Sequence, residues 1–206
     1  MTRRSTYRSL ASLQRDNHAC RACVEAGHPI ESMPVFEGHA GQKAYLFGLA
    51  PGIVEGEERR PWRGRAGRAL RRWLELDEER FCETFYLAAV TRCYPGKPSS
   101  GRGDRTTTPE ERRLCAFWQE WELRLLRPTL LVPVGGVAIK CLLGFDSLAC
   151  VGKRIELDGA VAAPTTAIPL PHPSGASGWL NDAANRERLE RALELLRGEL
   201  DGSDHH

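Results

Sequence analysis

Four short apolar runs divide this chain, and each ends in polar, glycine or proline residues. They cover residues 44–47, 85–89, 129–134 and 167–170, and segments with helical periodicity separate them. A short apolar run bounded by turn-forming residues is typical of a buried β-strand. Because such strands alternate here with helices, the pattern predicts an α/β fold with one parallel sheet.

The loops that follow the four runs are expected to form one composite site. The first loop is Gly48-Leu49-Ala50-Pro51-Gly52, and the others begin at Val90, Gly135 and Pro171. Open α/β sheets bind their ligands beyond the carboxyl ends of the strands, where such loops lie side by side. The Pro-Gly pair of the first loop breaks any helical pattern, so its backbone is expected to be exposed.

Helical periodicity accounts for most of the remaining chain. We expect helices over residues 7–26, 64–76, 137–143 and 182–200, and a further helix that begins with Thr108-Pro109-Glu110-Glu111. That last sequence combines an N-cap, a proline at the first helical position and a glutamate at the third, which is a strong start signal. Residues 94–107 are rich in Gly, Pro and Ser and are expected to form a mobile loop.

Length and composition favour a single soluble domain. The chain has 206 residues, of which 41% are hydrophobic. We expect one domain over residues 1–200 and a polar tail over 201–206, whose final histidines suggest a purification-tag remnant. No apolar run approaches the roughly 18 residues of a membrane span, and the N-terminus lacks the apolar segment of a signal peptide. A cytoplasmic protein with no membrane partner is therefore expected.

Charge is distributed unevenly along the chain. The formal net charge is only +2, but seven arginines lie within residues 59–72. Such a patch suits a polyanionic partner, whereas an arginine-rich composition would place similar residues on a solvated helix face. The predicted helix 64–76 begins near the composite site, where free amides and arginines can meet a phosphate together. That position favours the polyanion interpretation.

The seven cysteines suggest a second chemistry. An odd number in a cytosolic chain argues against a disulfide framework and favours metal ligation or burial. Cys20 and Cys23 form a C-x2-C pair, which is weak evidence when it stands alone. Cys82, Cys141 and Cys150 are expected to be small buried hydrophobic residues.

Taken in order, the motifs resemble those of the uracil-DNA glycosylase superfamily, and within it the iron–sulfur families four and five. GLAPG at residues 48–52 is similar to the first family-five motif, and RPWRGRAGRALRRWL at 60–74 to a family-four segment. AAVTRC at 88–93 resembles the family-five middle motif, and HPS at 172–174 the third. The resemblance extends over nearly the whole chain. It implies a three-layer α/β/α fold with a central four-stranded parallel sheet.

The resemblance also implies a 4Fe–4S cluster held by Cys20, Cys23, Cys93 and Cys115. On chemistry alone, four thiolates in two separated groups suit a tetrahedral zinc ion equally well, so zinc is the alternative. The spacing between Cys93 and Cys115 is longer than the family usually shows, because residues 94–107 lie between them. In these families the cluster is structural, and it ties the N-terminal helix and the loop beside the DNA surface.

For the chemistry, His172 and Trp62 are the main candidates. Breaking a base–sugar bond develops negative charge on the departing base, and His172 is expected to donate to its carbonyl, an interaction worth about 3 kcal/mol. Trp62 matches an aromatic residue that stacks on the extruded base in family four, worth about 1–3 kcal/mol. The alternatives are an ordinary loop histidine and an ordinary core tryptophan.

Further contacts are expected around these two residues. The loop residues Leu49, Ala50, Pro51 and Gly52, together with Ala89, are expected to contact the base. DNA contacts are expected from Arg65, Arg68, Lys97, Ser174, Gly175 and Trp179. Trp179 or Leu180 is the candidate for a wedge that fills the vacated stack, with anchoring of the last helix as the alternative.

Departures from the family patterns refine the expected reaction. Leu49 and Arg65 stand where family four and family five carry acidic residues. Glu55 aligns with a family-four glutamate and is expected to position the water, with a solvated loop carboxylate as the alternative. Ala89 replaces the asparagine that reads the uracil edge in family four, so selectivity should relax toward other deaminated bases.

These features imply a monofunctional DNA glycosylase that acts on uracil and on other deaminated bases in base excision repair. The alternative is a protein that binds damaged bases or abasic sites in DNA with little turnover, which the missing acidic residues motivate. The weakest alternative is an electron-transfer or zinc module. The expected partner is DNA containing a deaminated base. The protein is expected to be a monomer associated with the nucleoid of a bacterial or archaeal cell.

Overall fold

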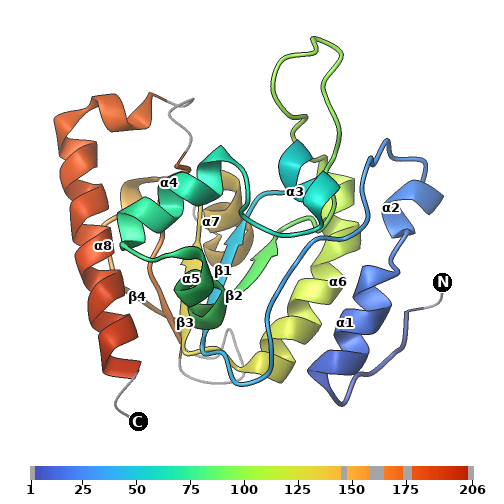
Figure 1. Cartoon of the computed structure of the whole chain (residues 1–206), viewed down its shortest axis with the longest axis horizontal. Helices are drawn as coiled ribbons and strands as arrows, with labels where there is room; N and C mark the ends of the chain where they lie inside the picture. The colour runs from blue at the N-terminus through green and yellow to red at the C-terminus, as the bar shows by residue number, and fades with distance from the viewer. Residues whose placement is uncertain (1–2, 145–147, 158–164, 174–177, 204–206) are drawn as a thin grey trace.

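A five-stranded sheet lies between two layers of helices (Figure 1). The structure is a computed structural model that describes residues 3–144, 148–157, 165–173 and 178–203. The strand order is β2-β1-β3-β5-β4. The strands are β1 (Ala44–Gly48), β2 (Phe85–Ala89), β3 (Leu130–Pro133), β4 (Ile155–Leu157) and β5 (Thr165–Ala167). The three-layer α/β/α arrangement is confirmed.

The sequence predicts four strands, and the described chain contains a fifth; the last parallel strand, β5, spans Thr165–Ala167 and so lies mostly before the predicted run 167–170. β1, β2, β3 and β5 pair in parallel, whereas β4 pairs antiparallel with β5 at the edge of the sheet. β4 has three residues, Ile155, Glu156 and Leu157, none of them fully buried. An apolar–polar–apolar triplet is too short to be distinguished from a loop by periodicity, so only pairing with β5 defines this strand.

The helices cover the two faces of the sheet. The α-helices are α1 (Leu10–His18), α2 (Ala22–Glu25), α3 (Ile53–Glu58), α4 (Arg65–Leu74), α5 (Glu78–Thr84), α6 (Pro109–Leu126), α7 (Gly136–Leu143) and α8 (Ala183–Ser203). Two short 3-10 helices, η1 (Leu148–Cys150) and η3 (Trp179–Asn181), complete the described elements. Figure 1 shows α4 and α8 on one side of the sheet and α1 and α6 on the other.

Alternation along the strands produces two separate cores. Leu46 and Leu87 point toward α4, α5 and α8 and belong to one buried cluster. Tyr45 and Tyr86, one residue earlier on the same strands, belong to a second cluster that contains residues of α1 and α6. Successive side chains of a strand point to opposite faces, and in a parallel sheet both faces are covered. This burial explains why the strands appear in the sequence as continuous apolar runs.

Two predicted helices begin as their sequences indicate. The Thr108 hydroxyl accepts a hydrogen bond from the Glu111 amide (3.1 Å), and the Glu111 carboxylate accepts one from the Thr108 amide (2.7 Å), so α6 starts with a complete capping box. Gly64 precedes α4, and Glu75 ends that helix in the left-handed conformation. Both helices therefore lie within a residue or two of the predicted positions.

The N-terminal helix is different from the prediction. A single helix over 7–26 is wrong, because α1 ends at His18 and α2 begins at Ala22. Cys20 lies in the break, where its sulfur accepts a hydrogen bond from the indole N–H of Trp118 in α6 (3.3 Å). Periodicity cannot show a tertiary contact of this kind.

The C-terminal helix also differs slightly from the prediction. α8 continues to Ser203 and so includes the first residues of the expected polar tail. No helix in the described ranges is long and apolar enough to cross a membrane. The prediction that residues 1–200 form one domain stays a prediction.

Candidate functional site

Backbone hydrogen bonds beyond the strands align the four strand ends that were expected to form the site. The Val90 amide donates to the Gly48 carbonyl (2.8 Å), and the Val134 amide donates to the Phe47 carbonyl (2.9 Å). The Gly135 amide donates to the Leu170 carbonyl (2.9 Å). The loops after β1, β2, β3 and β5 therefore begin side by side at one edge of the sheet.

Glu55 connects the loop after β1 to the start of α4. Its side chain is buried, and its two oxygens accept hydrogen bonds from the amides of Gly52 (3.1 Å) and Gly64 (2.6 Å). A Cβ atom at Gly52 would lie 2.8 Å from one of these oxygens, and a Cβ atom at Gly64 would lie 2.9 Å from the other. Glycine at both positions therefore lets one carboxylate hold loop 49–52 against the arginine-rich segment.

The ring of Trp62 packs against Gly48, the last residue of β1, and belongs to the buried core on that face of the sheet. It is 9% exposed, and a Cβ atom at Gly48 would be 3.0 Å from its indole ring. Its backbone has a φ of +59°, and its carbonyl accepts a hydrogen bond from Arg71 (2.9 Å). A bulky residue with positive φ is strained and needs support from its surroundings. The contacts place Trp62 beside the site, and its stacking on a base stays a prediction.

Ala89 and His172 lie on either side of this position. Ala89 is buried and pairs in register with Gly48. His172 is exposed and lies against Gly135, where a Cβ atom would be 3.4 Å from that of His172. Loss of water around the ring lowers the pKa of His172. The imidazole is therefore neutral near pH 7 and has one N–H group to donate.

The seven arginines of residues 59–72 fall into two groups. Arg60, Arg63 and Arg71 form ion pairs with the same residue, Glu78 of α5. The other four have exposed side chains and no carboxylate partner in the ranges that the structure describes; they are Arg59, Arg65, Arg68 and Arg72. The two arginines that we expect to contact DNA, Arg65 and Arg68, therefore belong to the group that is not neutralised.

The other expected DNA contacts lie on separate loops. Lys97 is exposed on the connection between β2 and α6, which projects beyond the edge of the sheet (Figure 1). Arg105 anchors that loop through the Pro95 carbonyl (3.0 Å) and the carboxylate of Glu111 (2.6 Å). Ser174 and Gly175 lie outside the described residues.

The position of Trp179 favours the anchoring alternative over the wedge. Trp179 in η3 is half-buried and packs on the core shared with α8, and its carbonyl accepts a hydrogen bond from Asn185 (2.9 Å). Leu180 packs against the same core. These contacts attach η3 to the start of the last helix.

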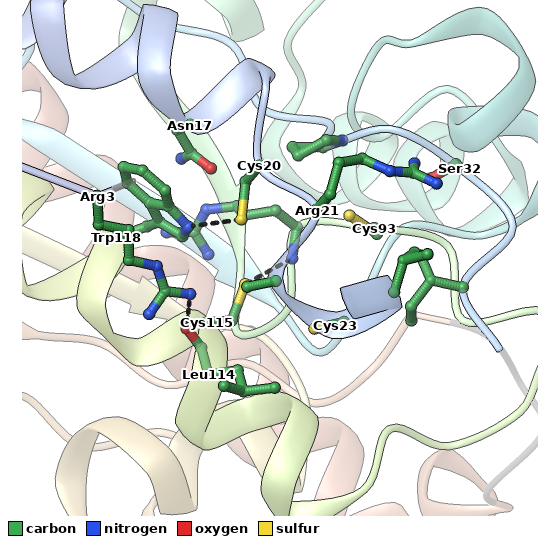
Figure 2. A pocket seen from close by; sticks show the side chains of 15 residues that line it. Arg3, Asn17, Cys20, Arg21, Cys23, Ser32, Cys93, Leu114, Cys115 and Trp118 are labelled. Atoms are coloured by element: carbon green, nitrogen blue, oxygen red, sulfur yellow. Dashed lines mark hydrogen bonds between the residues drawn. The ribbon is translucent and has the colours of Figure 1, made fainter. Parts of the chain in front are cut away.

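The four cysteines assigned by resemblance line a single pocket, which we call the thiol pocket (Figure 2). Cys20 and Cys23 reach it from the α1–α2 region, Cys93 from the loop after β2, and Cys115 from α6. Two N–H groups donate to the sulfurs: the Trp118 indole to Cys20 and the Arg92 amide to Cys115, both at 3.3 Å. Residues separated by almost a hundred positions are thus brought together.

Burial controls the charge state of these thiols. It raises the pKa of Cys23 to about 12, and the nearby thiols of Cys115 and Cys20 raise it further. The same causes, again with burial first, raise the pKa of Cys93. Because neighbouring thiolates repel one another in a buried site, a positively charged group is needed to hold them in the ionised form. The donor set therefore fits a bound metal centre.

Among the described residues, no three His, Cys, Asp or Glu side chains are arranged to hold a single metal ion. A tetrahedral zinc ion needs all its sulfur ligands at about 2.3 Å from one point. The assignment of a 4Fe–4S cluster rather than a zinc ion stays a prediction that rests on the family resemblance.

A buried polar network borders the thiol pocket, and the sequence pattern did not reveal it. The guanidinium of Arg92 donates to the Glu122 carboxylate (2.5 Å) and to the Tyr45 hydroxyl (3.1 Å). Asn17 also donates to Glu122 (3.3 Å). The available signal was the spacing of Glu111, Cys115, Trp118 and Glu122, which all fall on the buried face of α6.

The remaining cysteines only partly match the expectation. Cys150 is buried, and Cys82 is half-buried against the core beside β2. Cys141 is exposed, so the expectation of burial is wrong there. α7 buries Ala138 and Ile139, which leaves position 141 on its solvent face.

Comparisons with known proteins add an independent finding. A family model described as the uracil DNA glycosylase superfamily matches residues 36–197. A type-4 uracil-DNA glycosylase from Thermotoga maritima is 27% identical over 174 residues, which cover 80% of this chain and 83% of that protein. The family match includes all five strands and the loops after them, and it begins after Cys20 and Cys23.

Proposed function

The chain belongs to the uracil DNA glycosylase superfamily, whose members hydrolyse the N-glycosidic bond between base and sugar, and we propose that it excises uracil from DNA. The alignment of the four strand ends carries this proposal. Loop 49–52, Ala89 and His172 lie at or just after these strand ends, Trp62 packs against Gly48, and all of them are within the matched range. The similarity to a type-4 uracil-DNA glycosylase supports uracil as a substrate.

His172 supplies the donor for the departing base in this proposal. The bond breaks with negative charge developing on the base, so a donor that is fixed before the reaction lowers the barrier. Pro171 and Pro173 on either side are buried and restrict the backbone at this position. The lowered pKa keeps the ring neutral, so it contributes a hydrogen bond without adding a full positive charge.

The surroundings of Ala89 support a relaxed base preference. A methyl group offers no hydrogen bond to the edge of a base, and Ala89 is fixed by its pairing with Gly48. A site that lacks a specific polar partner rejects analogues weakly, because no buried group is left unpaired by the wrong base. We therefore propose that other deaminated bases are also substrates.

Glu55 would position both the base-binding loop and a water molecule. Its oxygens accept the amides of Gly52 and Gly64, and each oxygen retains a second lone pair. The carboxylate can thus fix the base-binding loop and orient a water through the remaining lone pairs. Positioning, rather than proton abstraction, is the role that these contacts support.

The DNA would lie across the carboxyl edge of the sheet. Arg65 and Arg68 on α4 and Lys97 on the projecting loop are exposed, so they are available to phosphates. Ser174 and Gly175, which lie outside the described residues, stay predicted DNA contacts. Binding through such contacts weakens as salt rises, because counterions compete for the phosphates.

Cys20, Cys23, Cys93 and Cys115 would hold a 4Fe–4S cluster. The four thiols share one pocket, and two N–H groups already donate to the sulfurs, which supports this proposal. When bound, such a cluster supplies four strong bonds that tie together segments far apart in the sequence. The chain's own contribution is to hold α1, α2, α6 and the loop after β2 around it.

One set of reactions tests the proposed activity. The protein is incubated with oligonucleotides that carry uracil, hypoxanthine or xanthine, as single and double strands, and released bases are separated by chromatography. We expect release of uracil and slower release of the other two bases. No base release from any substrate at low or moderate salt would contradict the proposal.

A second function is favoured by one specific observation. Leu49 and Arg65 replace acidic residues, and both oxygens of Glu55 are engaged by amides, so the chain has few groups to activate water. A protein of this kind would bind damaged bases or abasic sites and turn over slowly. Tight binding of an abasic-site duplex in a gel-shift assay, without base release, would support this alternative.

A further inference from the structure

Two buried side chains that border the thiol pocket have polar atoms without partners in the described ranges. They are Arg92, whose Nε and Nη1 atoms make no hydrogen bond, and Asn17, whose Oδ1 atom accepts none. Arg92 is 1% exposed and Asn17 is 0% exposed. An unsatisfied buried donor is costly, so each such group calls for an explanation.

Arg92 is held firmly in this position. Its Nη2 atom donates to both Glu122 and Tyr45, and the Tyr45 hydroxyl itself donates to Glu122 (2.6 Å). The backbone amide of Arg92 donates to the sulfur of Cys115, and the next residue in the chain is Cys93. The backbone of Arg92 thus lies against a sulfur of the thiol pocket, and its bonds to Glu122 and Tyr45 fix the guanidinium in an orientation that does not depend on any bound group.

We propose that Arg92 and Glu122 set the reduction potential of the cluster in the thiol pocket. Arg92 acts through its positive charge and its unpaired N–H groups. The negative charge of Glu122 opposes that effect. The inference rests on the cluster proposed above. A 4Fe–4S core with four thiolates carries net negative charge, which increases when the cluster gains an electron. Net charge and hydrogen bonds to the sulfurs both control the potential of such a centre.

The two charges should act in opposite directions. The positive charge of Arg92 stabilises the reduced cluster and raises the potential, whereas the negative charge of Glu122 lowers it. Both residues are buried, so water and salt screen their effects weakly. Both residues therefore act on the reduction potential through their charge and are not ligands of the cluster.

Glu122→Gln is the decisive variant, because the amide keeps the size of the side chain and can still accept the Tyr45 hydroxyl. Protein purified without oxygen is titrated with a reductant, and the cluster is followed by electron paramagnetic resonance and visible absorbance. We expect Glu122→Gln to shift the reduction potential in the positive direction and Arg92→Gln to shift it in the negative direction. Opposite shifts could not come from loss of packing alone.

Arg21→Gln is the matched control, because Arg21 lines the same pocket but is exposed, so that solvent screens its charge. Its shift should be smaller than that of either buried variant. The inference is overturned if both buried variants shift the potential in the same direction, or by no more than Arg21→Gln. If Arg92→Gln fails to fold, Glu122→Gln alone decides. A reduction potential equal to or more negative than that of wild type would then overturn the inference. Wild-type protein without iron and sulfide would instead refute the cluster itself.

Discussion

At the scale of single residues, Glu55 shows how much a buried carboxylate can do without touching substrate. Its two hydrogen bonds join loop 49–52 to the turn before α4, and no other described side chain bridges the Gly52 and Gly64 amides. Hydrogen bonds to a charged group contribute about 1.5–3 kcal/mol each when their removal leaves a buried donor unpaired. Stability and the geometry of the base site therefore depend on the same side chain.

Glu55→Gln should destabilise the protein by about 1–3 kcal/mol, because an amide presents one oxygen acceptor and turns its NH2 group toward the other backbone donor. Urea unfolding at pH 7 measures this change. Glu57→Gln is the control, since Glu57 is exposed on the same helix and should leave stability unchanged. A Glu55→Gln protein that is as stable as wild type but has lost base release would assign Glu55 a purely chemical role.

His172 should make stability depend on pH. Although the residue as a whole is exposed, loss of water around its ring lowers the folded-state pKa of His172, so the unfolded chain binds a proton more readily than the folded one. The contribution of His172 is fully present above the unfolded pKa of about 6.5 and is lost as the pH falls through and below that value. The melting temperature should thus fall between pH 7.5 and pH 5.5, and by less in His172→Gln. Equal falls in both proteins would contradict the assignment.

Single-residue roles were predictable only where a residue lies in a motif. His172 and the four cysteines could be proposed from the sequence, and the structure brings the cysteines into one pocket. The ion pair between Arg92 and Glu122 could not, because its members lie 30 positions apart and the helical spacing that puts Glu122 on the buried face of α6 does not identify its partner. The partners of a buried charge are defined by tertiary packing, which local patterns do not report.

At the scale of elements, the close approach of α4 to the residues before it determines where Trp62 lies. A Cβ atom at Gly67 would be 1.7 Å from the Trp62 carbonyl oxygen, a backbone atom that cannot move aside cheaply. The positive φ of Trp62 is therefore maintained by a helix that packs directly on its peptide group. Glycine is unfavourable inside a helix, but this contact requires it at position 67.

Gly67→Ala should destabilise the protein by about 1–3 kcal/mol, as overpacking of a close contact does. Gly198→Ala in α8 is the control, because nothing lies within 4 Å of a Cβ atom there. That substitution should stabilise the protein by about 0.5–1 kcal/mol, since alanine loses less entropy in a helix. Urea unfolding of both variants gives the comparison. A stabilised Gly67→Ala protein would show that the turn at Trp62 can relax freely.

Helices and strands were predicted correctly where the sequence carries a clear apolar pattern. They were missed where tertiary packing determines the start or end of an element. β1, β2 and β3 were predicted because each is buried on both faces and appears as an apolar run, whereas β5 begins with two threonines and was expected too late, at 167–170. β4 was missed because three residues with a polar centre carry no usable period. The break between α1 and α2 was missed because the contact between Cys20 and Trp118 is tertiary.

At the scale of the whole molecule, the proposed DNA surface combines α4 with the projecting loop between β2 and α6 (Figure 1). Arg60, Arg63 and Arg71 pair with Glu78. They therefore contribute more to the stability of the fold than to the positive electrostatic potential of the surface. The arginine count alone overstates the charge available to DNA. Arg65 and Arg68 are the residues that should report phosphate contacts.

The Arg65→Gln, Arg68→Gln double variant should bind DNA more weakly and with a shallower salt dependence. Each lost phosphate contact reduces the slope of log K against log salt by about 0.9 for duplex DNA. Binding of a fluorescent duplex at several salt concentrations measures the slope. Arg63→Gln is the control, because Arg63 is engaged by Glu58 and Glu78 and should leave the slope nearly unchanged. Equal slopes for wild type and the double variant would exclude these two contacts.

The central claim is that the aligned strand ends form a site that releases a base from DNA. The most direct measurement is the rate of free uracil release from a uracil-containing oligonucleotide by wild type and by His172→Ala, with folding of both proteins checked by circular dichroism. We predict release by wild type and a rate lower by roughly 100- to 1000-fold in the variant, the usual cost of removing one donor to a developing negative charge. Absence of uracil release by the wild-type protein, or equal rates for the two proteins, would contradict the claim.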